Sequence, residues 1–252
     1  MSAYEFFNYG AIIPNIVTDA GDGTLTYPIW IAVVLCAVAG IIAYFLGGLN
    51  FAVIISKYKF HDDIRRYGSG NAGMTNMLRT YGKAAAAFTL LGDMAKTAVS
   101  VLGGTLLCGE AGAYIAGLCC VIGHAFPCYY GFKGGKGIVV TATMLLCLEP
   151  IVFLILFTIF VLLVASTKFL SLGSIIGMLL YPLILNRMYF FLNGTAQGVV
   201  PAVVSVLNTL LVVWLHRENL KRLWTGTENK FSLKKKDKFL KEEKSDEGET
   251  DK

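Results

Sequence analysis

The sequence predicts an all-α polytopic membrane protein, a bundle of about seven transmembrane helices with its N-terminus outside the cytoplasm and its C-terminus inside. Of the 252 residues, 55% are hydrophobic and 15% are charged, and the mean hydropathy is +0.61. This is too apolar for a soluble domain of that length. Apolar runs alternate with polar loops, and Lys and Arg gather in alternate loops, which is typical of the cytoplasmic side.

Residues 1–27 are predicted to be an extracytoplasmic extension, because they contain acidic residues but no Lys or Arg. They lack the basic start of a cleaved signal peptide, and residues 6–17 could form a short helix along the membrane interface. The first transmembrane helix is predicted at 28–56, within a charge-free run from Gly23 to Ser56. The basic loop that follows is expected in the cytoplasm.

The second and third spans are predicted at 84–109 and 111–130, with an outer turn at Glu110. Asp93 and Lys96 interrupt the second span at a spacing of i, i+3, so they share one helix face and can pair. Ionisable residues inside a span usually face a protein interior or a site. The pair could therefore be structural or could support a site.

Residues 137–167 would form a helix of roughly 46 Å, longer than the hydrocarbon core of roughly 30 Å. Pro150 is expected to break it, because proline ends or kinks a helix. We therefore predict two spans, 137–148 and 150–166, with Glu149 between them. The last two spans are predicted at 169–186 and 199–215.

Four crossings then separate Lys136 from His216, so three polar clusters should face the cytoplasm together. These clusters are residues 62–83, 123–137 and 216–228. They belong to a membrane domain over 28–228. Residues 229–252 are rich in Lys, Glu and Asp and are predicted to be a disordered cytoplasmic tail.

The first cluster contains a loop of glycines and neutral polar side chains that ends in a fixed cation. Such a loop is typical of anion binding, although a plain turn is the common alternative. Its candidate residues are Gly68, Ser69, Gly70, Asn71, Thr75, Asn76 and Arg79. The second cluster places glycines and two lysines at the start of a helix, which suits a phosphate. Its candidates are His124, Lys133, Gly134, Gly135, Lys136 and Gly137.

In the third cluster His216 and Asn219 share one helix face, and Glu228 could orient a neighbouring cation. The sequence contains no Walker loop, no G-x-S-x-G elbow and no histidine followed four residues later by aspartate. The histidines are too irregularly spaced to indicate a metal, no cofactor is predicted, and the six cysteines suit a reduced setting. Nucleic-acid binding is not predicted, because the basic residues are scattered over loops.

The strings DIRRYGSGNAGMTNMLRTYGK, GDMAK, GHAFPCYYGFKGGKG and HRENLKRLWTGTE resemble the motifs of the bacterial acyl-phosphate:glycerol-3-phosphate acyltransferases, in order over 62–228. The chain departs from the family at Ala72 and Met74, where proline and alanine are common. The resemblance implies a multi-pass enzyme of the bacterial plasma membrane with a cytoplasmic site. It implies transfer of a fatty acyl group from acyl phosphate to the 1-hydroxyl of glycerol 3-phosphate, giving lysophosphatidate and phosphate.

The resemblance also implies roles for the candidate residues. Those for glycerol 3-phosphate and the reacting centre are Ser69, Arg79, Lys136, His216 and Asn219. Those for the acyl phosphate are Asn71, Thr75, Asn76 and the amides of Gly134, Gly135 and Gly137, with Gly68 and Gly70 in the same loop. Supporting residues are Asp93, Lys96, His124 and Glu228.

The hydroxyl proton could pass to the donor's own phosphate, and His216 is the competing base. The soluble enzyme that forms acyl phosphate is a further candidate partner. The alternative from another class is a transporter of a phosphorylated metabolite, which would place its site near the bilayer midplane between internal repeats. The clusters gather instead at one predicted membrane face.

Overall fold

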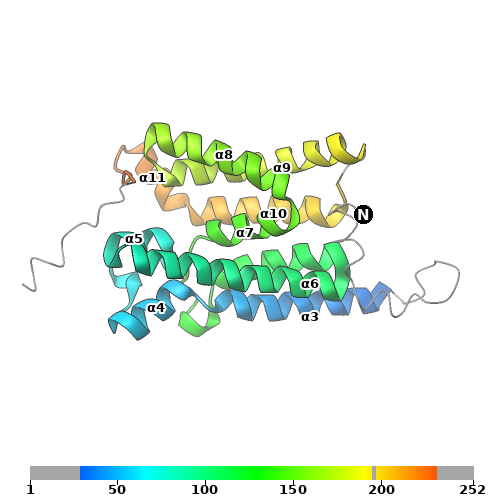
Figure 1. Cartoon of the computed structure of the whole chain (residues 1–252), viewed down its shortest axis with the longest axis horizontal. Helices are drawn as coiled ribbons and strands as arrows, with labels where there is room; N and C mark the ends of the chain where they lie inside the picture. The colour runs from blue at the N-terminus through cyan, green and yellow to red at the C-terminus, as the bar shows by residue number, and fades with distance from the viewer. Residues whose placement is uncertain (1–28, 195–196, 232–252) are drawn as a thin grey trace, which may run out of the picture.

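The computed structural model describes residues 29–194 and 197–231, all in helices and connecting loops (Figure 1). The predicted extension, the segment at 6–17 and the tail beyond Phe231 lie outside the described residues. Nine α-helices and two 3-10 helices are described: α3 Ile29–Gly48, α4 Phe51–Phe60, η1 Ile64–Arg66, α5 Met74–Tyr81, α6 Lys83–Ala125, η2 Cys128–Tyr130, α7 Ile138–Leu148, α8 Pro150–Thr167, α9 Leu170–Asn193, α10 Val199–Leu215 and α11 Arg217–Trp224.

The first span predicted over 28–56 is confirmed as one apolar span of 28 residues, Val33–Phe60, but the helix within it breaks between α3 and α4. Asn50 begins the second piece as its N-cap, and its side-chain oxygen accepts the N–H of Val53 at 3.1 Å. Lys96 Nζ donates to the carbonyls of Gly47 and Leu49, both at 2.9 Å. The break therefore has its own polar partners, which an apolar sequence run does not reveal.

Helix α6 reverses direction at Cys108 and Gly109, close to the turn predicted at Glu110. Gly109 has φ of 60°, and the backbones on either side approach so closely that a Cβ on Gly104 would lie 2.4 Å from the carbonyl oxygen of Gly112. Farther along, Lys96 Nζ lies 3.0 Å from His124 Nδ1, 28 residues away in sequence. The two arms of α6 are therefore antiparallel, and glycine permits their contact.

The predicted break at Glu149 and Pro150 is confirmed. Helix α7 ends at Leu148 and α8 starts with Pro150 in its first turn, where proline is tolerated. Helix α10 has the predicted bounds. Helix α9 continues to Asn193 instead of ending at 186, because the exposed Arg187 is one polar residue on a helix surface and does not stop the helix.

Within the described residues, four helices are long and apolar enough to cross a membrane, or five if α10 and α11, bent by 56°, are one span. The doubled-back α6 enters that count once. Helix α7 has 11 residues, about 16 Å, and is shorter than a full crossing. The protein is thus a helical membrane protein, while the count of seven spans stays a prediction.

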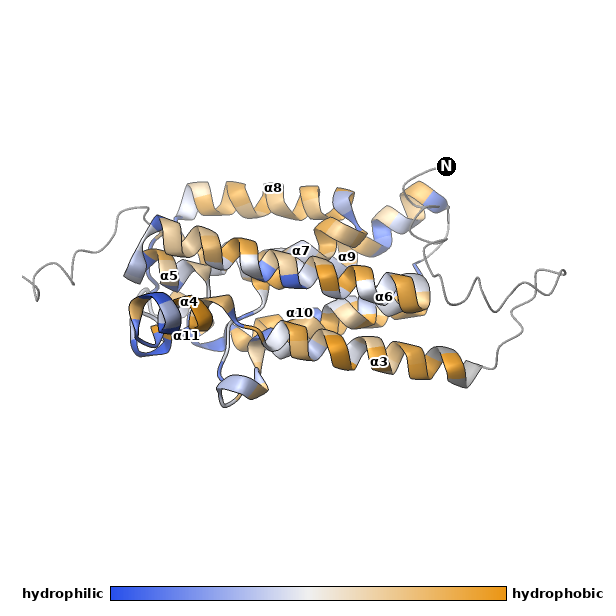
Figure 2. Cartoon of the chain, turned by 60° about the horizontal axis from the view of Figure 1, so that its bottom comes forward, coloured by the Kyte–Doolittle hydropathy of each residue, from blue (hydrophilic) through white to orange (hydrophobic). Residues whose placement is uncertain are grey.

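The long helices share a core built mainly by α6, α7, α8, α9 and α10, with Tyr114, Met144 and Tyr181 fully buried within it. A second, smaller core around Ile64 and Met77 lies where α4, α5 and the start of α6 meet. Figure 2 shows hydrophobic residues along the long helices and a hydrophilic cluster at the end that holds α4, α5 and α11. The polar motifs therefore gather at one end of the bundle.

Candidate active site

The side chain of Asn76 on α5 shapes the loop that precedes this helix. Its oxygen accepts the Ser69 N–H at 3.1 Å, and its nitrogen donates to the carbonyls of Ile64 at 3.3 Å and Tyr67 at 2.9 Å. Gly68 has φ of 59°, and a Cβ there would lie 2.3 Å from Asn76 Oδ1. Glycine is therefore needed at this position so that the loop can close around Asn76.

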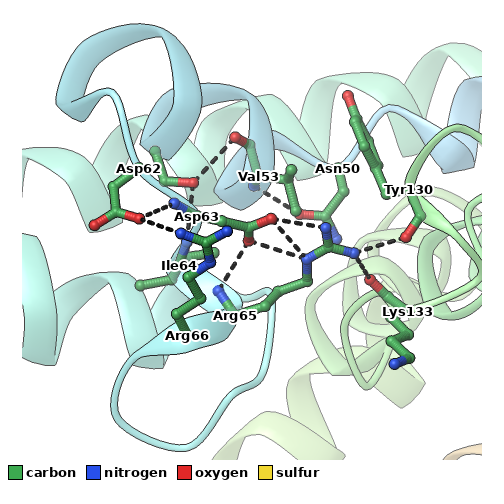
Figure 3. Close-up of polar contacts among 10 residues, drawn as sticks. Asn50, Val53, Asp62, Asp63, Ile64, Arg65, Arg66, Tyr130 and Lys133 are labelled. Carbon is green, nitrogen blue, oxygen red and sulfur yellow. Dashed lines mark hydrogen bonds and ion pairs between the residues drawn. The ribbon is translucent and has the colours of Figure 1, made fainter.

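Arg65 joins this first loop, residues 67–73, to the second loop, residues 126–137, which connects α6 to α7 (Figure 3). Its Nη1 donates to the carbonyls of Tyr130 at 2.7 Å and Lys133 at 3.0 Å, while Nε and Nη2 bind the Asp63 carboxylate at 3.0 and 2.7 Å. Hydrogen bonding to Arg65 holds the pKa of Asp63 below its usual range. A planar guanidinium can make all these bonds at once, and an ammonium group cannot.

A second brace runs through Ala72, which is fully buried. Its N–H donates to the Gly134 carbonyl at 3.4 Å, and its own carbonyl accepts the side-chain nitrogen of Asn50 at 3.1 Å. The first loop, the second loop and the start of α4 are thereby fixed relative to one another.

The amides of Gly134 and Gly135, predicted from the sequence to bind a substrate, form hydrogen bonds within the protein instead. They donate to the carbonyls of Ala125 at 3.0 Å and His124 at 3.1 Å, so both already have protein acceptors. A Cβ on Gly135 would lie 2.1 Å from His124 Nε2, which explains the need for glycine. Gly137, with φ of 80°, begins α7 and does face the site.

The predicted pairing of Asp93 with Lys96 is confirmed, with Nζ 2.7 Å from Oδ1. His124 Nδ1 lies 3.6 Å from the same carboxylate oxygen. All three side chains are buried, and the cation of Lys96 compensates the carboxylate as well as binding the carbonyls at the α3–α4 break. The triad adjoins the second loop, because the His124 carbonyl accepts the Gly135 N–H.

Glu228 organises the third cluster. Its Oε1 accepts from Asn219 at 2.8 Å and Ser171 at 2.9 Å, and its Oε2 accepts from Arg222 at 2.8 Å. Burial raises the pKa of Glu228, but these donors outweigh it and hold the pKa below its usual value. The oxygen of Asn219 accepts from Lys136 Nζ. Burial, reinforced by the Arg222 charge, lowers the pKa of Lys136 to about 8.

His216 stands at the bend between α10 and α11. Its Nδ1 lies 2.8 Å from the Val212 carbonyl, which can only accept, so Nδ1 carries the proton and Nε2 carries a lone pair. Burial lowers the pKa of His216 to about 4, and the Lys136 cation also acts to lower it. The imidazole is therefore neutral at pH 7 and able to accept a proton.

A cavity of about 490 Å³ connects these groups. The predicted site residues that line it are Ser69, Asn71, Thr75, Asn76, Arg79, Asp93, His124, Lys136, Gly137, His216, Asn219 and Glu228. Gly68, Gly70, Lys96, Gly134 and Gly135 lie outside its lining. Arg79, Lys136 and Arg222 bring positive charge to its polar end.

The other end of the cavity is apolar. Its walls come from Leu145 and Leu146 on α7, Phe153 and Phe157 on α8, and Met178 on α9. Leu146 is 40% exposed and Phe157 is 49% exposed, so this end borders the outer, lipid-facing surface of the bundle. One cavity thus joins an anion-binding end to a surface that suits a hydrocarbon chain.

Sequence reasoning missed several residues that build this site. Asn50 lies in a long charge-free run, and a polar side chain within that run was the one sequence feature that could have indicated its role. Arg65 and Arg222 looked like ordinary basic loop residues, and Ser171 looked like a polar residue of a span. Arg65 and Ser171 have partners 65 and 57 residues away in sequence, which a local pattern does not reveal. The partner of Arg222 is 6 residues away.

The chain matches the family model described as glycerol-3-phosphate acyltransferase over residues 37–226. It is 42% identical over 194 residues to a glycerol-3-phosphate acyltransferase of Thermoanaerobacter sp. (strain X514), covering 77% of this chain and 94% of the relative. The enzyme of the same name from Clostridioides difficile (strain 630) is 38% identical over 208 residues, covering 79% and 96%.

Among solved structures, the chain is similar to PlsY, an integral membrane glycerol 3-phosphate acyltransferase. The glycerol 3-phosphate form has a TM-score of 0.69 and 30% identity over 78% of this chain and 96% of that one. The lysophosphatidic acid form has a TM-score of 0.67 and 28% identity over 79% and 96%. The match to the family model, the shared fold and the coverage of 94–96% of each relative lead to one conclusion: this chain belongs to the glycerol-3-phosphate acyltransferase family.

Proposed function

We propose that the protein transfers a fatty acyl group from an acyl phosphate to the 1-hydroxyl of glycerol 3-phosphate, giving lysophosphatidate and phosphate. The observation that carries this proposal is the cavity, whose polar end is lined by Arg79, Lys136 and Arg222 and whose other end is apolar. Both substrates are anionic phosphates, and one brings a hydrocarbon chain. The relatives named glycerol-3-phosphate acyltransferase support the acceptor, and the transporter alternative has no support among them.

The two phosphates need separate partners at the polar end. In this proposal Arg79, Lys136 and Asn219 bind the glycerol 3-phosphate, with Ser69 and His216 near its hydroxyl. The partners of the donor phosphate are Asn71, Thr75 and Gly137, while Asn76, predicted from the sequence as a further partner, shapes the loop because both N–H groups of its side chain donate to backbone carbonyls. Support comes from their common lining of one cavity and from the cations, which suit phosphate oxygens. Gly134 and Gly135 keep a positioning role, because their amides bond within the protein.

The chemistry requires no covalent intermediate with the protein. The 1-hydroxyl oxygen attacks the acyl carbonyl carbon, the new ester bond forms, and the bond from that carbon to the phosphate oxygen breaks. Phosphate leaves with the bonding electron pair. Because an acyl phosphate is already activated, the protein contributes mainly orientation and stabilisation of the developing negative charge.

In this proposal the leaving phosphate accepts the hydroxyl proton. Neutral His216 is the second candidate for the proton acceptor. A His216→Gln variant keeps hydrogen-bonding ability but has no basic nitrogen. If the donor phosphate takes the proton, turnover at saturating substrates should stay within about tenfold of wild type. A fall of 10²-fold or more, the usual contribution of a general base, would assign the proton to His216.

Seven crossings with a cytoplasmic site remain our proposal for the topology. The side of the site is supported by Arg65, Arg66 and Lys133, which lie close together (Figure 3), because the rule for positive loops places such residues inside. In that orientation the apolar end of the cavity points into the bilayer.

The test of the proposal is a donor comparison with purified protein in detergent and labelled glycerol 3-phosphate. Palmitoyl phosphate, the thioester of acyl carrier protein and the thioester of coenzyme A are supplied separately. Lysophosphatidate should form from the acyl phosphate alone. Product from a thioester alone would refute the donor, and no product from any donor, with the protein folded, would refute the transfer reaction.

A further inference from the structure

The apolar end of the cavity lies against a row of three phenylalanines on α8. The rings of Phe153 and Phe157 stack with centroids 5.5 Å apart, and those of Phe157 and Phe160 stack at 6.3 Å. All three line the cavity. Stacking fixes their orientation, so they form one firm wall along which a hydrocarbon chain can lie.

Two glycines on the neighbouring helix α9 also line the cavity, and their surroundings differ. A Cβ on Gly173 would lie 2.9 Å from Phe160 Cδ2, so α8 and α9 are in close contact there. At Gly177, one turn farther along the helix, a Cβ would have no heavy atom within 4 Å. A side chain at Gly177 would therefore extend into open space where the helix lines the cavity.

The position of Gly177 along the cavity follows from its helix. Ser171, on the same helix, donates to Glu228 at the polar end. Six residues separate it from Gly177, which is about 9 Å of helix. A long acyl chain that starts at the polar end and runs along α9 therefore passes Gly177, whereas a short acyl chain ends before it.

We propose that Gly177 sets the length of acyl chain that the enzyme accepts, because its open position admits the distal part of a long chain between α8 and α9. This inference rests on the proposed function and identifies its donor as long-chain. Gly177 is a specificity residue in this account and takes no part in the chemistry.

The test replaces Gly177 with alanine and with leucine and measures kcat/KM for hexanoyl, decanoyl and palmitoyl phosphate with glycerol 3-phosphate. Each methylene that no longer fits should cost about fourfold, the value of burying one methylene. Gly177→Ala should lower the palmitoyl-to-hexanoyl ratio about fourfold, and Gly177→Leu on the order of a hundredfold. Rates with hexanoyl phosphate should stay close to wild type.

The matched control is Gly103→Leu. Gly103 is also a helical glycine at which a Cβ would have no heavy atom within 4 Å, but it lies on α6 outside the cavity lining. This variant should keep the wild-type ratio. Both changes replace glycine within a helix, so neither is expected to weaken the helix.

An unchanged ratio in both Gly177 variants would overturn the inference, and so would an equal loss with every donor in a folded variant. If Gly177→Leu does not fold, the ratio in Gly177→Ala decides. Failure of the wild-type protein to use any acyl phosphate is a different result, which refutes the proposed function itself.

Discussion

Lys136 and Lys133 lie three residues apart in the second loop but have different surroundings. Lys136 lines the cavity, donates to Asn219 and is close enough to Arg222 for that charge to lower its pKa. Lys133 is exposed and lies outside the cavity lining. Lys136 therefore contributes its charge to the site, whereas Lys133 is an ordinary basic loop residue.

Lys136→Met is expected to lower kcat/KM for glycerol 3-phosphate by about thirtyfold, because it removes a charged hydrogen bond worth about 2 kcal/mol. Lys133→Met is the matched control and should stay within about twofold. Steady-state rates with both variants at saturating acyl phosphate provide the measurement. Equal losses in the two variants would show that the net charge of the loop matters and the position does not.

The pKa of Lys136, lowered to about 8, predicts a pH dependence. The cationic form, which prevails below that pKa, binds phosphate, so kcat/KM for glycerol 3-phosphate should fall as the pH rises through about 8. The substrate phosphate is already a dianion there. The measurement is a profile from pH 6.5 to 9.5, and Lys136→Met should lack the fall. A wild-type profile that is flat over this range would contradict the assignment.

At the scale of elements, the site depends on braces between loops that have no local sequence signature. Arg65 holds the carbonyls of Tyr130 and Lys133, whereas its neighbour Arg66 is 80% exposed and lies 3.9 Å from Asp62. The two arginines are adjacent in sequence but have different structural roles.

Arg65→Ala is expected to lower kcat/KM by about tenfold, because losing its two hydrogen bonds to the second loop, worth about 0.5–1.5 kcal/mol each, frees that loop. Arg66→Ala should stay within about twofold. Hydrogen exchange of residues 126–136 should rise in the first variant only. Normal exchange in an impaired Arg65→Ala variant would mean that Arg65 acts other than by bracing this loop.

The sequence predicted those features that depend on local chemistry. Pro150 broke the helix where expected, and Asp93 and Lys96 paired because i, i+3 residues share a helix face. Features that depend on distant partners were not predictable: the break between α3 and α4 lies in a charge-free run, and the Lys96 side chain that binds its carbonyls is 47 to 49 residues away. The amides of Gly134 and Gly135 looked free in sequence, and only the fold brings the carbonyls of His124 and Ala125 to them.

At the scale of the whole molecule, the bundle brings α5 and α11, which carry distant sequence motifs, to one end (Figure 1). A cavity with an apolar end lies beside these motifs. The short helix α7 contributes to both ends of this cavity, with Gly137 just before it and Leu146 near its end. We therefore propose that both substrates occupy this one cavity at the same time, so that the acyl group passes directly between them.

Initial-rate kinetics test this claim most directly. Glycerol 3-phosphate and palmitoyl phosphate are varied together over a grid of concentrations in detergent micelles of fixed composition. Direct transfer within a ternary complex predicts double-reciprocal lines that intersect. Parallel lines, the kinetic signature of a covalent acyl-enzyme, would contradict the account, because they would mean that the two substrates occupy the site in turn.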